Sequence, residues 1–183
     1  MPPAPPPNYL AGYPPHLIDS VRHAIANGKL AENLLGKYPQ AHDIRTDTAL
    51  YDYVQGLRSR HLKNTQTISK VAYDNKLQAV HKALGTHTNI GRIQGGKIKA
   101  KREIRVGGLF RDMPGEFLRM IVVHELAHLR ESEHNKSFYQ LCMHMEANYF
   151  QLEFDLRAYL CYLDAGGLAL WTTPIPDGEP AGA

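Results

Sequence analysis

The sequence predicts an α+β domain, in which helices precede and follow a small sheet. Over most of the chain, apolar residues recur every three or four positions, which is the spacing of an amphipathic helix. Between residues 97 and 106 the pattern changes, and apolar residues alternate with charged ones as in a half-buried strand. Runs of helices on either side of a short strand region are typical of this class.

The first secondary-structure elements expected along the chain are two helices. Apolar residues at helical spacing cover residues 17–25 and stop at Asn27-Gly28, a pair that favours a turn. A shorter apolar run over residues 30–35 ends at Gly36, because glycine commonly follows the last helical residue.

Three further elements are expected before the region of alternating residues. Residues 50–61 predict a helix, with Thr46 or Asp47 as the N-cap that accepts a hydrogen bond from its first turn. Residues 67–73 predict a short strand, and residues 77–84 predict a helix that a glycine closes.

The middle of the chain predicts a β-hairpin near residues 90–106, in a small mixed sheet. Gly95-Gly96 is a favourable two-residue turn. The strand that follows, over residues 98–106, places its apolar side chains on one face and its basic side chains on the other. Arg102 alone interrupts the apolar face.

The last part of the chain predicts helices again. Asp112 and Pro114 open one that covers about residues 114–130, since an acid near the start and a proline in the first turn are favourable there. A final helical stretch covers residues 138–163, and Asn148 is a position where it could break in two.

Composition divides the chain into a single domain and two tails. We expect a disordered proline-rich tail over residues 1–8, one domain over residues 9–166 and a flexible tail over residues 167–183. The N-terminus lacks the features of a signal peptide, and no apolar run reaches the roughly 18 residues of a membrane span. Two cysteines without a paired spacing fit a reducing compartment. A cytoplasmic location is therefore expected.

The chemistry of the protein is predicted by the segment HELAH, which has the pattern HExxH. Four residues advance a helix by about one turn, so His124 and His128 lie on one face and can bind one Zn²⁺ ion. Glu125 lies beside the first ligand and is expected to take a proton from the water that the metal activates. A shuffled chain of this composition contains HExxH roughly 0.03 times, so chance is a weak explanation.

A third metal ligand is needed, and His134 is the leading candidate. Six helical steps turn about 600°, so His134 can reach the metal only if the helix ends first and the chain turns back. Metzincins make this turn with a glycine, but this chain has Glu131 at that position. Glu131 is the rival ligand, available if the helix continues. A structural zinc site is less favoured because it usually has four Cys or His ligands.

A resemblance to a known family extends this interpretation. The segments IVVHELAHLRESEHNKSFYQLCMHME, QLEFDLRAYL and RIQGGKIKAKREIRV resemble the YgjP-like metallopeptidase family of bacteria, over roughly residues 8–163. The resemblance implies a small zincin-like fold, with an edge strand beside the active-site helix. It also implies His124, His128 and His134 as zinc ligands and Glu125 as general base.

Two substrates are compatible with this family, some of whose bacterial members are described as UTP pyrophosphatases. The basic strand could attract a triphosphate, although lysines on an exposed strand more commonly prevent aggregation. Pyrophosphatases commonly use Mg²⁺ held by carboxylates, whereas histidines favour zinc. We therefore expect a zinc-dependent hydrolase that acts on a polypeptide, with a nucleotide as the alternative substrate. A non-catalytic nucleic-acid-binding module with a structural metal is a third, less supported hypothesis.

Other residues are expected to be structural. His144 is interpreted as a partly exposed helix residue rather than a ligand. Tyr139, Tyr149 and Tyr162 could stabilise an oxyanion, but each is more typical of the core or the rim of a site.

Overall fold

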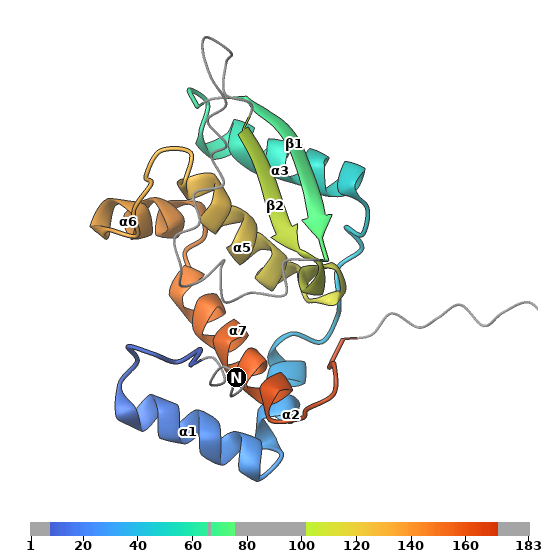
Figure 1. The fold of residues 1–183 in the computed structure, drawn as a ribbon, viewed down its shortest axis with the longest axis vertical. Coiled ribbons are helices and arrows are strands. Elements are labelled where there is room, and N and C mark those ends of the chain that lie inside the picture. The colour runs from blue at the N-terminus through green and yellow to red at the C-terminus, as the bar shows by residue number, and fades with distance from the viewer. Residues whose placement is uncertain (1–7, 66, 76–101, 172–183) are drawn as a thin grey trace, which may run out of the picture.

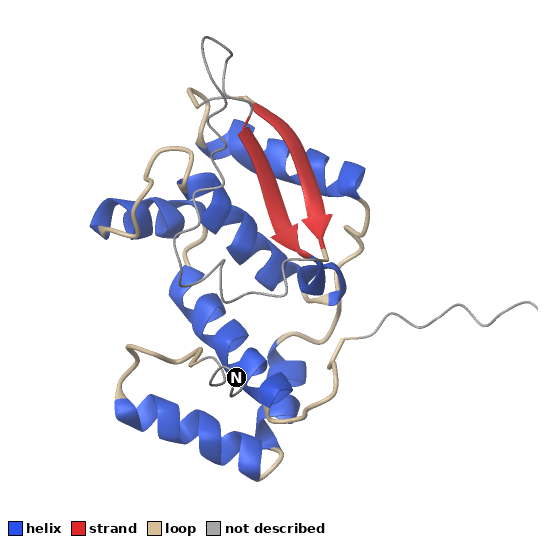
Figure 2. Cartoon of the chain, viewed as in Figure 1, coloured by secondary structure: helices blue, strands red, loops and turns tan. Residues whose placement is uncertain are grey.

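The computed structural model describes residues 8–65, 67–75 and 102–171 of the chain. Within these residues it has six α-helices, one short 3-10 helix and two strands (Figure 1), and Figure 2 shows helices on several sides of the strands. The predicted α+β class is confirmed. In chain order the elements are α1 (Pro15–Ala26), α2 (Lys29–Lys37), α3 (Asp47–His61), β1 (Ile68–Asp74), β2 (Arg102–Gly107), η1 (Gly108–Asp112), α5 (Gly115–Ala127), α6 (Lys136–Met145) and α7 (Tyr149–Asp164).

The first three helices begin and end close to their predicted positions. Gly28, between α1 and α2, has a φ of 72°, a left-handed conformation that glycine adopts without the strain a β-carbon would cause. Thr46 is the N-cap of α3, and its hydroxyl accepts a hydrogen bond from the backbone nitrogen of Ala49 at 3.2 Å. Of the two candidate caps named for this helix, the threonine is therefore the one used.

The two described strands are parallel neighbours, with Val71 opposite Ile104 and Tyr73 opposite Val106. Helix α3 packs against β1, and α5 packs against β2 (Figure 1). Parallel strands need a long connection between them. That connection, which includes the predicted helix over 77–84 and the predicted Gly95-Gly96 turn, lies outside the described residues.

Helix α5 is the centre of the core. Nine of its thirteen residues are buried, and it packs against α3, α6, α7 and β2. A helix that is apolar on nearly all sides is stable only when other elements surround it. The buried residues are Phe117, Leu118, Met120, Ile121, Val122, Val123, His124, Leu126 and Ala127. The core therefore fixes the backbone that carries the first predicted ligand.

The predicted C-terminal helical stretch forms two helices. Helix α6 ends at Met145 and α7 starts at Tyr149, so the predicted break at Asn148 is confirmed. Asn135 caps α6 through its side-chain oxygen, which accepts from the backbone nitrogen of Phe138 at 2.9 Å. This cap fixes where α6 begins, immediately after His134.

Trp171 lies within the region predicted as a flexible tail, yet it is 5% exposed. Its indole nitrogen donates to the Tyr38 carbonyl at 2.6 Å, and its ring contacts those of Phe117 and Tyr159 at centroid distances of 5.7 and 4.9 Å. The packed core therefore reaches residue 171, and the flexible tail over residues 167–183 stays a prediction as a whole. The other domain boundaries stay predictions.

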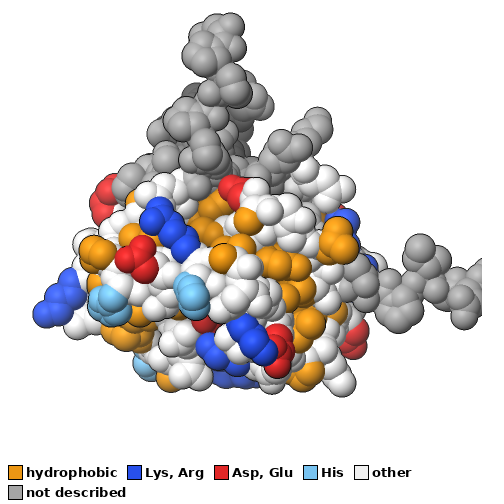
Figure 3. Space-filling model, turned by 90° about the horizontal axis from the view of Figure 1, so that it is seen from below, with side chains coloured by type: hydrophobic (Ala, Val, Ile, Leu, Met, Phe, Trp, Pro, Cys, Tyr) orange, Lys and Arg blue, Asp and Glu red, His pale blue; other side chains and the backbone are white. Residues whose placement is uncertain are grey.

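None of the helices in the described parts of the chain has the length and apolar character that crossing a membrane requires. Figure 3 shows one face of the molecule, on which basic and acidic side chains lie in small mixed groups among hydrophobic ones. A face of this kind does not form the continuous basic area that a nucleic-acid backbone favours.

Candidate metal centre

Two of the predicted ligands come from the end of α5. His124 lies in its last turn, and His128 is the residue that ends it, with φ and ψ of −64° and −11°. Because four residues complete about one turn, both imidazoles leave the same side of the helix. Their ring centroids lie 5.0 Å apart. The structure thus brings together the two histidines of the HExxH pattern.

The chain turns back after α5 and returns His134 to the same side. The backbone nitrogens of Arg130 and Glu131 both lie 3.0 Å from the Ala127 carbonyl that they donate to, which tightens the helix end. Asn135 then caps α6, which begins at Lys136. The turn that metzincins make with glycine is therefore made here with Glu131 in that position.

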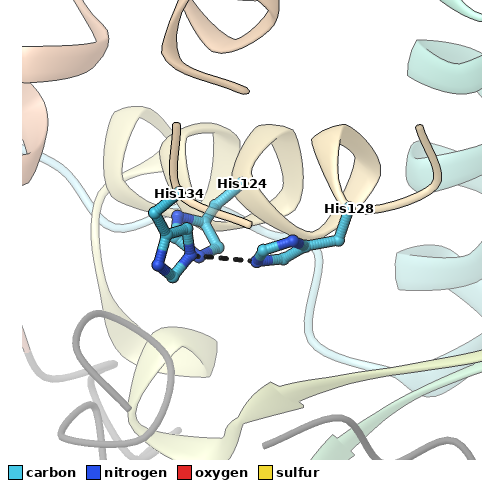
Figure 4. A group of neighbouring side chains, drawn as sticks. All are labelled: His124, His128 and His134. Carbon is cyan, nitrogen blue, oxygen red and sulfur yellow. Dashed lines mark hydrogen bonds between the residues drawn. The ribbon is translucent and has the colours of Figure 1, made fainter. Parts of the chain in front are cut away.

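Three imidazole nitrogens converge at the centre of the site (Figure 4). Nε2 of His134 lies 3.1 Å from Nε2 of His124 and 3.1 Å from Nε2 of His128. Three bonds of about 2.0–2.1 Å to one tetrahedral zinc would place such nitrogens about 3.3 Å apart. These two distances differ from that value by a few tenths of an ångström, and the three nitrogens all lie within 4.8 Å of one another, so the three residues could hold one metal ion.

Each of the two α5 histidines has a partner on its other ring nitrogen. Nδ1 of His124 lies 2.7 Å from the Tyr149 hydroxyl, and Nδ1 of His128 lies 2.9 Å from the Glu131 carbonyl oxygen. A carbonyl only accepts, so Nδ1 of His128 carries the proton, and Nε2 is the ring nitrogen that presents its lone pair to the group of three. Glu131, the rival third ligand, thus contributes its backbone oxygen, while its side chain is outside the group of three.

Phe138 supports all three rings at once. It is fully buried on α6, and its ring centroid lies 4.9, 4.6 and 4.7 Å from those of His124, His128 and His134. Packing of this kind restricts the rotamers of the imidazoles before any ligand binds. The site is therefore held by the first turn of α6 as well as by α5.

Burial keeps His124 in the form that binds metals. Its side chain is 3% exposed, and burial together with the two neighbouring imidazoles lowers its pKa well below the usual 6.5. The ring is therefore neutral at physiological pH. A neutral imidazole offers a lone pair to a cation, whereas a protonated one does not.

Glu125 follows the first ligand on α5 and is half-buried. Burial raises the pKa of its carboxyl group from 4.5 to about 7. Among the described residues, none donates a hydrogen bond to this carboxylate. A carboxyl group with a pKa near neutrality can both accept and return a proton at physiological pH, which is what general acid–base catalysis requires.

Arg102 connects the sheet to the metal centre. It is the residue that interrupts the apolar face of β2, and its guanidinium donates to the His128 carbonyl at 3.1 Å. The backbone of His128 is therefore held from the strand side. The interruption of the apolar pattern was visible in the sequence, but its partner was not, because the two residues are 26 positions apart.

Arginines lie on and after the basic strand predicted over residues 98–106, and the basic region that they form with its lysines spans residues 97–119. Three of these arginines make contacts within the protein. Arg105 pairs with Asp74 at 2.9 Å, and Arg111 lies over the Tyr73 ring at 4.8 Å. Arg119 pairs with Glu146. These contacts favour a structural role for this part of the region. Lys97, Lys99 and Lys101 lie outside the described residues.

Two of the residues expected to be structural, His144 and Tyr149, contact other side chains of the protein. His144 is exposed on α6, and its ring lies against His61 with 5.8 Å between centroids, outside the group of three histidines. Tyr149 is fully buried, and its hydroxyl is engaged by His124 rather than pointing to a substrate oxyanion. Its part in orienting the ligand was missed in the sequence analysis.

A three-histidine group on an HExxH helix within an α+β fold defines a metal-dependent hydrolase. Comparison with known proteins agrees with this class. The family described as YgjP-like, metallopeptidase domain, matches residues 96–159. The UTP pyrophosphatase of Escherichia coli (strain K12) is 55% identical over 158 residues, which cover 86% of this chain and 95% of that enzyme.

The chain therefore belongs to the YgjP-like family, as its sequence motifs predict. The family description and the relative's name both denote hydrolases. This goes against the third hypothesis, a non-catalytic binding module. The search of solved structures found no match.

Proposed function

We propose that this protein is a zinc-dependent UTP pyrophosphatase, with His124, His128 and His134 as metal ligands and Glu125 as general base. The choice of substrate rests on one observation. The chain is 55% identical to an enzyme of that name over nearly that enzyme's whole length. The sequence alone favoured a polypeptide. Identity of this extent outweighs that preference, which rested on the general tendency of histidines to bind zinc rather than Mg²⁺.

The donor set supports zinc as the metal. Three neutral imidazoles suit zinc better than Mg²⁺, which prefers oxygen ligands in an octahedral arrangement. Three protein ligands also leave one tetrahedral position open, as in catalytic rather than structural sites. When bound, the ion supplies Lewis-acid activation of water and of a phosphoryl oxygen.

The reaction is the hydrolysis of UTP to UMP and pyrophosphate. The oxygen of a water molecule bonds to the α-phosphorus, and the bond from that phosphorus to the bridging oxygen breaks. Glu125 accepts the proton that the attacking water loses and returns it to solvent or to the departing pyrophosphate. Its half-buried position and its raised pKa support this exchange near neutral pH.

Measurement of pyrophosphate release tests the proposal. The zinc-loaded protein should release pyrophosphate from UTP, and Glu125→Gln should reduce turnover by about 100-fold or more while zinc stays bound. His128→Ala should lose both zinc and activity. An unchanged rate in Glu125→Gln would remove the general base from the proposal, and no release by the wild-type protein would reject the substrate.

Peptide hydrolysis is the second candidate, favoured by the HExxH pattern and by the family's description as a metallopeptidase domain. The same residues could direct water to an amide carbonyl. Incubation of the zinc-loaded protein with an unfolded polypeptide, followed by mass spectrometry, separates the two. Glu125-dependent cleavage without pyrophosphate release from UTP would favour the peptidase.

A further inference from the structure

A cavity of about 300 Å³ lies between the N-terminal segment ahead of α1 and the two C-terminal helices. Its walls combine aromatic rings with one acidic and one basic side chain. The residues that line it are Ala11, Gly12, Tyr13, Tyr139, Phe150, Glu153 and Arg157. Its volume is at the lower end of the range of small-molecule sites, which is about 300–1,000 Å³.

One aromatic ring separates this cavity from the metal centre. Tyr139 lines the cavity, and its ring centroid lies 6.4 Å from that of His134. On its other side Tyr139 lies 5.3 Å from Phe150, which also lines the cavity. A molecule with one end at the three histidines and the other in the cavity would therefore pass beside Tyr139.

The aromatic walls are suited to a flat, unsaturated ring. Phe150 is 47% exposed although it is a large apolar side chain, so part of its ring is open to a ligand. The rings of Tyr139 and Phe150 contact each other, with 5.3 Å between centroids and an inclination of 32°, so they form one aromatic wall. Proteins commonly hold unpaired nucleobases by stacking them against such side chains.

The polar side chains of the cavity are held in a fixed arrangement. Glu153 is 7% exposed, and Arg157 donates to its Oε1 atom from Nε at 3.0 Å and from a terminal nitrogen at 2.7 Å. Arg157 also donates to the Tyr9 carbonyl at 2.9 Å. Among the described residues, no hydrogen bond is made to the second carboxylate oxygen of Glu153. That oxygen is an acceptor for a ligand.

A carboxylate acceptor that faces N3 of the base distinguishes the two common pyrimidines. Uracil carries an N–H donor at N3, between two carbonyl groups, whereas cytosine has an unprotonated acceptor nitrogen there. Glu153 can accept a hydrogen bond from N3–H of uracil, but it would face the lone pair on N3 of cytosine. A buried polar group left without its partner costs binding energy, so such a site rejects the wrong base more strongly than shape alone would.

We infer that this cavity is the base subsite of the enzyme, and that it holds uracil against the exposed side of Phe150 with Glu153 accepting from N3–H. The inference rests on the proposed function, since it requires a nucleotide whose phosphates reach the three histidines. The acidic side chain of the cavity then gives a preference for UTP over CTP, and the exposed aromatic ring binds either base.

Steady-state kinetics with UTP and CTP test the subsite. Phe150→Ala should raise KM for UTP about 10-fold with little change in kcat, because stacking holds the base and does not take part in bond breaking. Glu153→Gln should lower the ratio of kcat/KM for UTP to that for CTP about 10-fold. Glu32→Gln is the matched control, since Glu32 is exposed on α2 and pairs only with Lys29 among the described residues. Glu32→Gln should leave both the KM for UTP and the ratio of kcat/KM for UTP to that for CTP unchanged.

The outcomes that overturn the inference are distinct from a failure of the proposed function. If UTP is hydrolysed but both variants keep the wild-type KM and base preference, the cavity does not hold the base. Loss of fold in Glu153→Gln would show in its melting temperature. In that case the KM of Phe150→Ala, which changes an exposed position, decides whether the cavity holds the base. If the wild-type protein hydrolyses no UTP, the proposed function fails, and nucleoside binding decides the subsite.

Saturation-transfer NMR with uridine and with cytidine provides that second measurement, because neither nucleoside carries phosphate or needs the metal. The inference expects a signal from uridine that exceeds the one from cytidine and falls in Phe150→Ala. Absence of a uridine signal in the wild-type protein would reject the subsite. Equal signals from both nucleosides would reject the role of Glu153.

Discussion

The Tyr149 hydroxyl and the Nδ1 atom of His124 lie 2.7 Å apart in the core, although the two residues are 25 positions apart in the chain. With Nε2 facing the other histidines, Nδ1 is the nitrogen that remains for this bond. A partner at this position sets the direction in which the imidazole presents its lone pair.

Tyr149→Phe is therefore expected to weaken metal binding without unfolding the protein. The change removes one oxygen atom and keeps the buried ring, and loss of such an outer partner typically costs about 10–100-fold in metal affinity. Competition with a chelator measures the affinity. Tyr162→Phe, at a partly exposed position outside the metal centre, is the control and should bind zinc like the wild-type protein. Equal affinities for all three proteins would contradict the orienting role.

His134→Ala and Glu131→Ala distinguish the two candidate third ligands. His134 contributes its Nε2 atom to the group of three, whereas Glu131 contributes its backbone carbonyl, which alanine retains. We expect His134→Ala to lower zinc affinity by more than about 100-fold, beyond the effect of an outer partner, and Glu131→Ala to have little effect. The opposite result would make the Glu131 carboxylate the ligand.

Glu125→Gln is expected to stabilise the metal-free protein at neutral pH. Burial raises the pKa of Glu125 to about 7, so between pH 4.5 and 7 the folded state binds more protons than the unfolded state. The wild-type protein consequently loses stability as pH rises through this window, and the glutamine variant does not. The difference in unfolding free energy should grow to roughly 3 kcal/mol above pH 7.

Urea unfolding at pH 5 and pH 8 in the presence of a chelator measures this difference. The lowered pKa of His124 has the opposite effect, since stability is lost as pH falls below 6.5. Both proteins carry His124, so its contribution cancels in the comparison. A gap that is equal at the two pH values would show that Glu125 is not desolvated.

Removal of Trp171 is expected to destabilise the fold. A chain that ends at residue 166, the predicted end of the domain, loses the indole that packs on Phe117 and Tyr159. It also leaves the Tyr38 carbonyl without the donor that it has in the full chain. Loss of a buried aromatic side chain of this size costs about 3–5 kcal/mol. A chain that ends at residue 171 is the control, and equal unfolding midpoints for the two chains would contradict the prediction.

Local features of the fold could be predicted from the sequence because they depend on neighbouring residues. Helical spacing gave α1, α2 and α3, and the cap of α3 followed from a short polar side chain at Thr46. The HExxH pattern gave two adjacent histidines on one face of α5, since helix geometry alone determines their separation.

Features that depend on distant residues could not be predicted in this way. No local pattern indicates that Tyr149 meets His124, or that the indole of Trp171 reaches the Tyr38 carbonyl. The spacing of His134 made it a candidate ligand, but only the turn after α5 determines where its ring lies. Pairings of this kind follow from how whole elements pack, which a single sequence does not encode locally.

The residues at positions 11–13 belong to the wall of the cavity, and the Tyr9 carbonyl just ahead of them holds Arg157 of that wall, far ahead of the HExxH segment in the chain. An expressed fragment restricted to the family match, residues 96–159, would keep the histidines but lack that wall. Screening such a fragment for small-molecule inhibitors would therefore sample a different surface from the one that the intact protein presents.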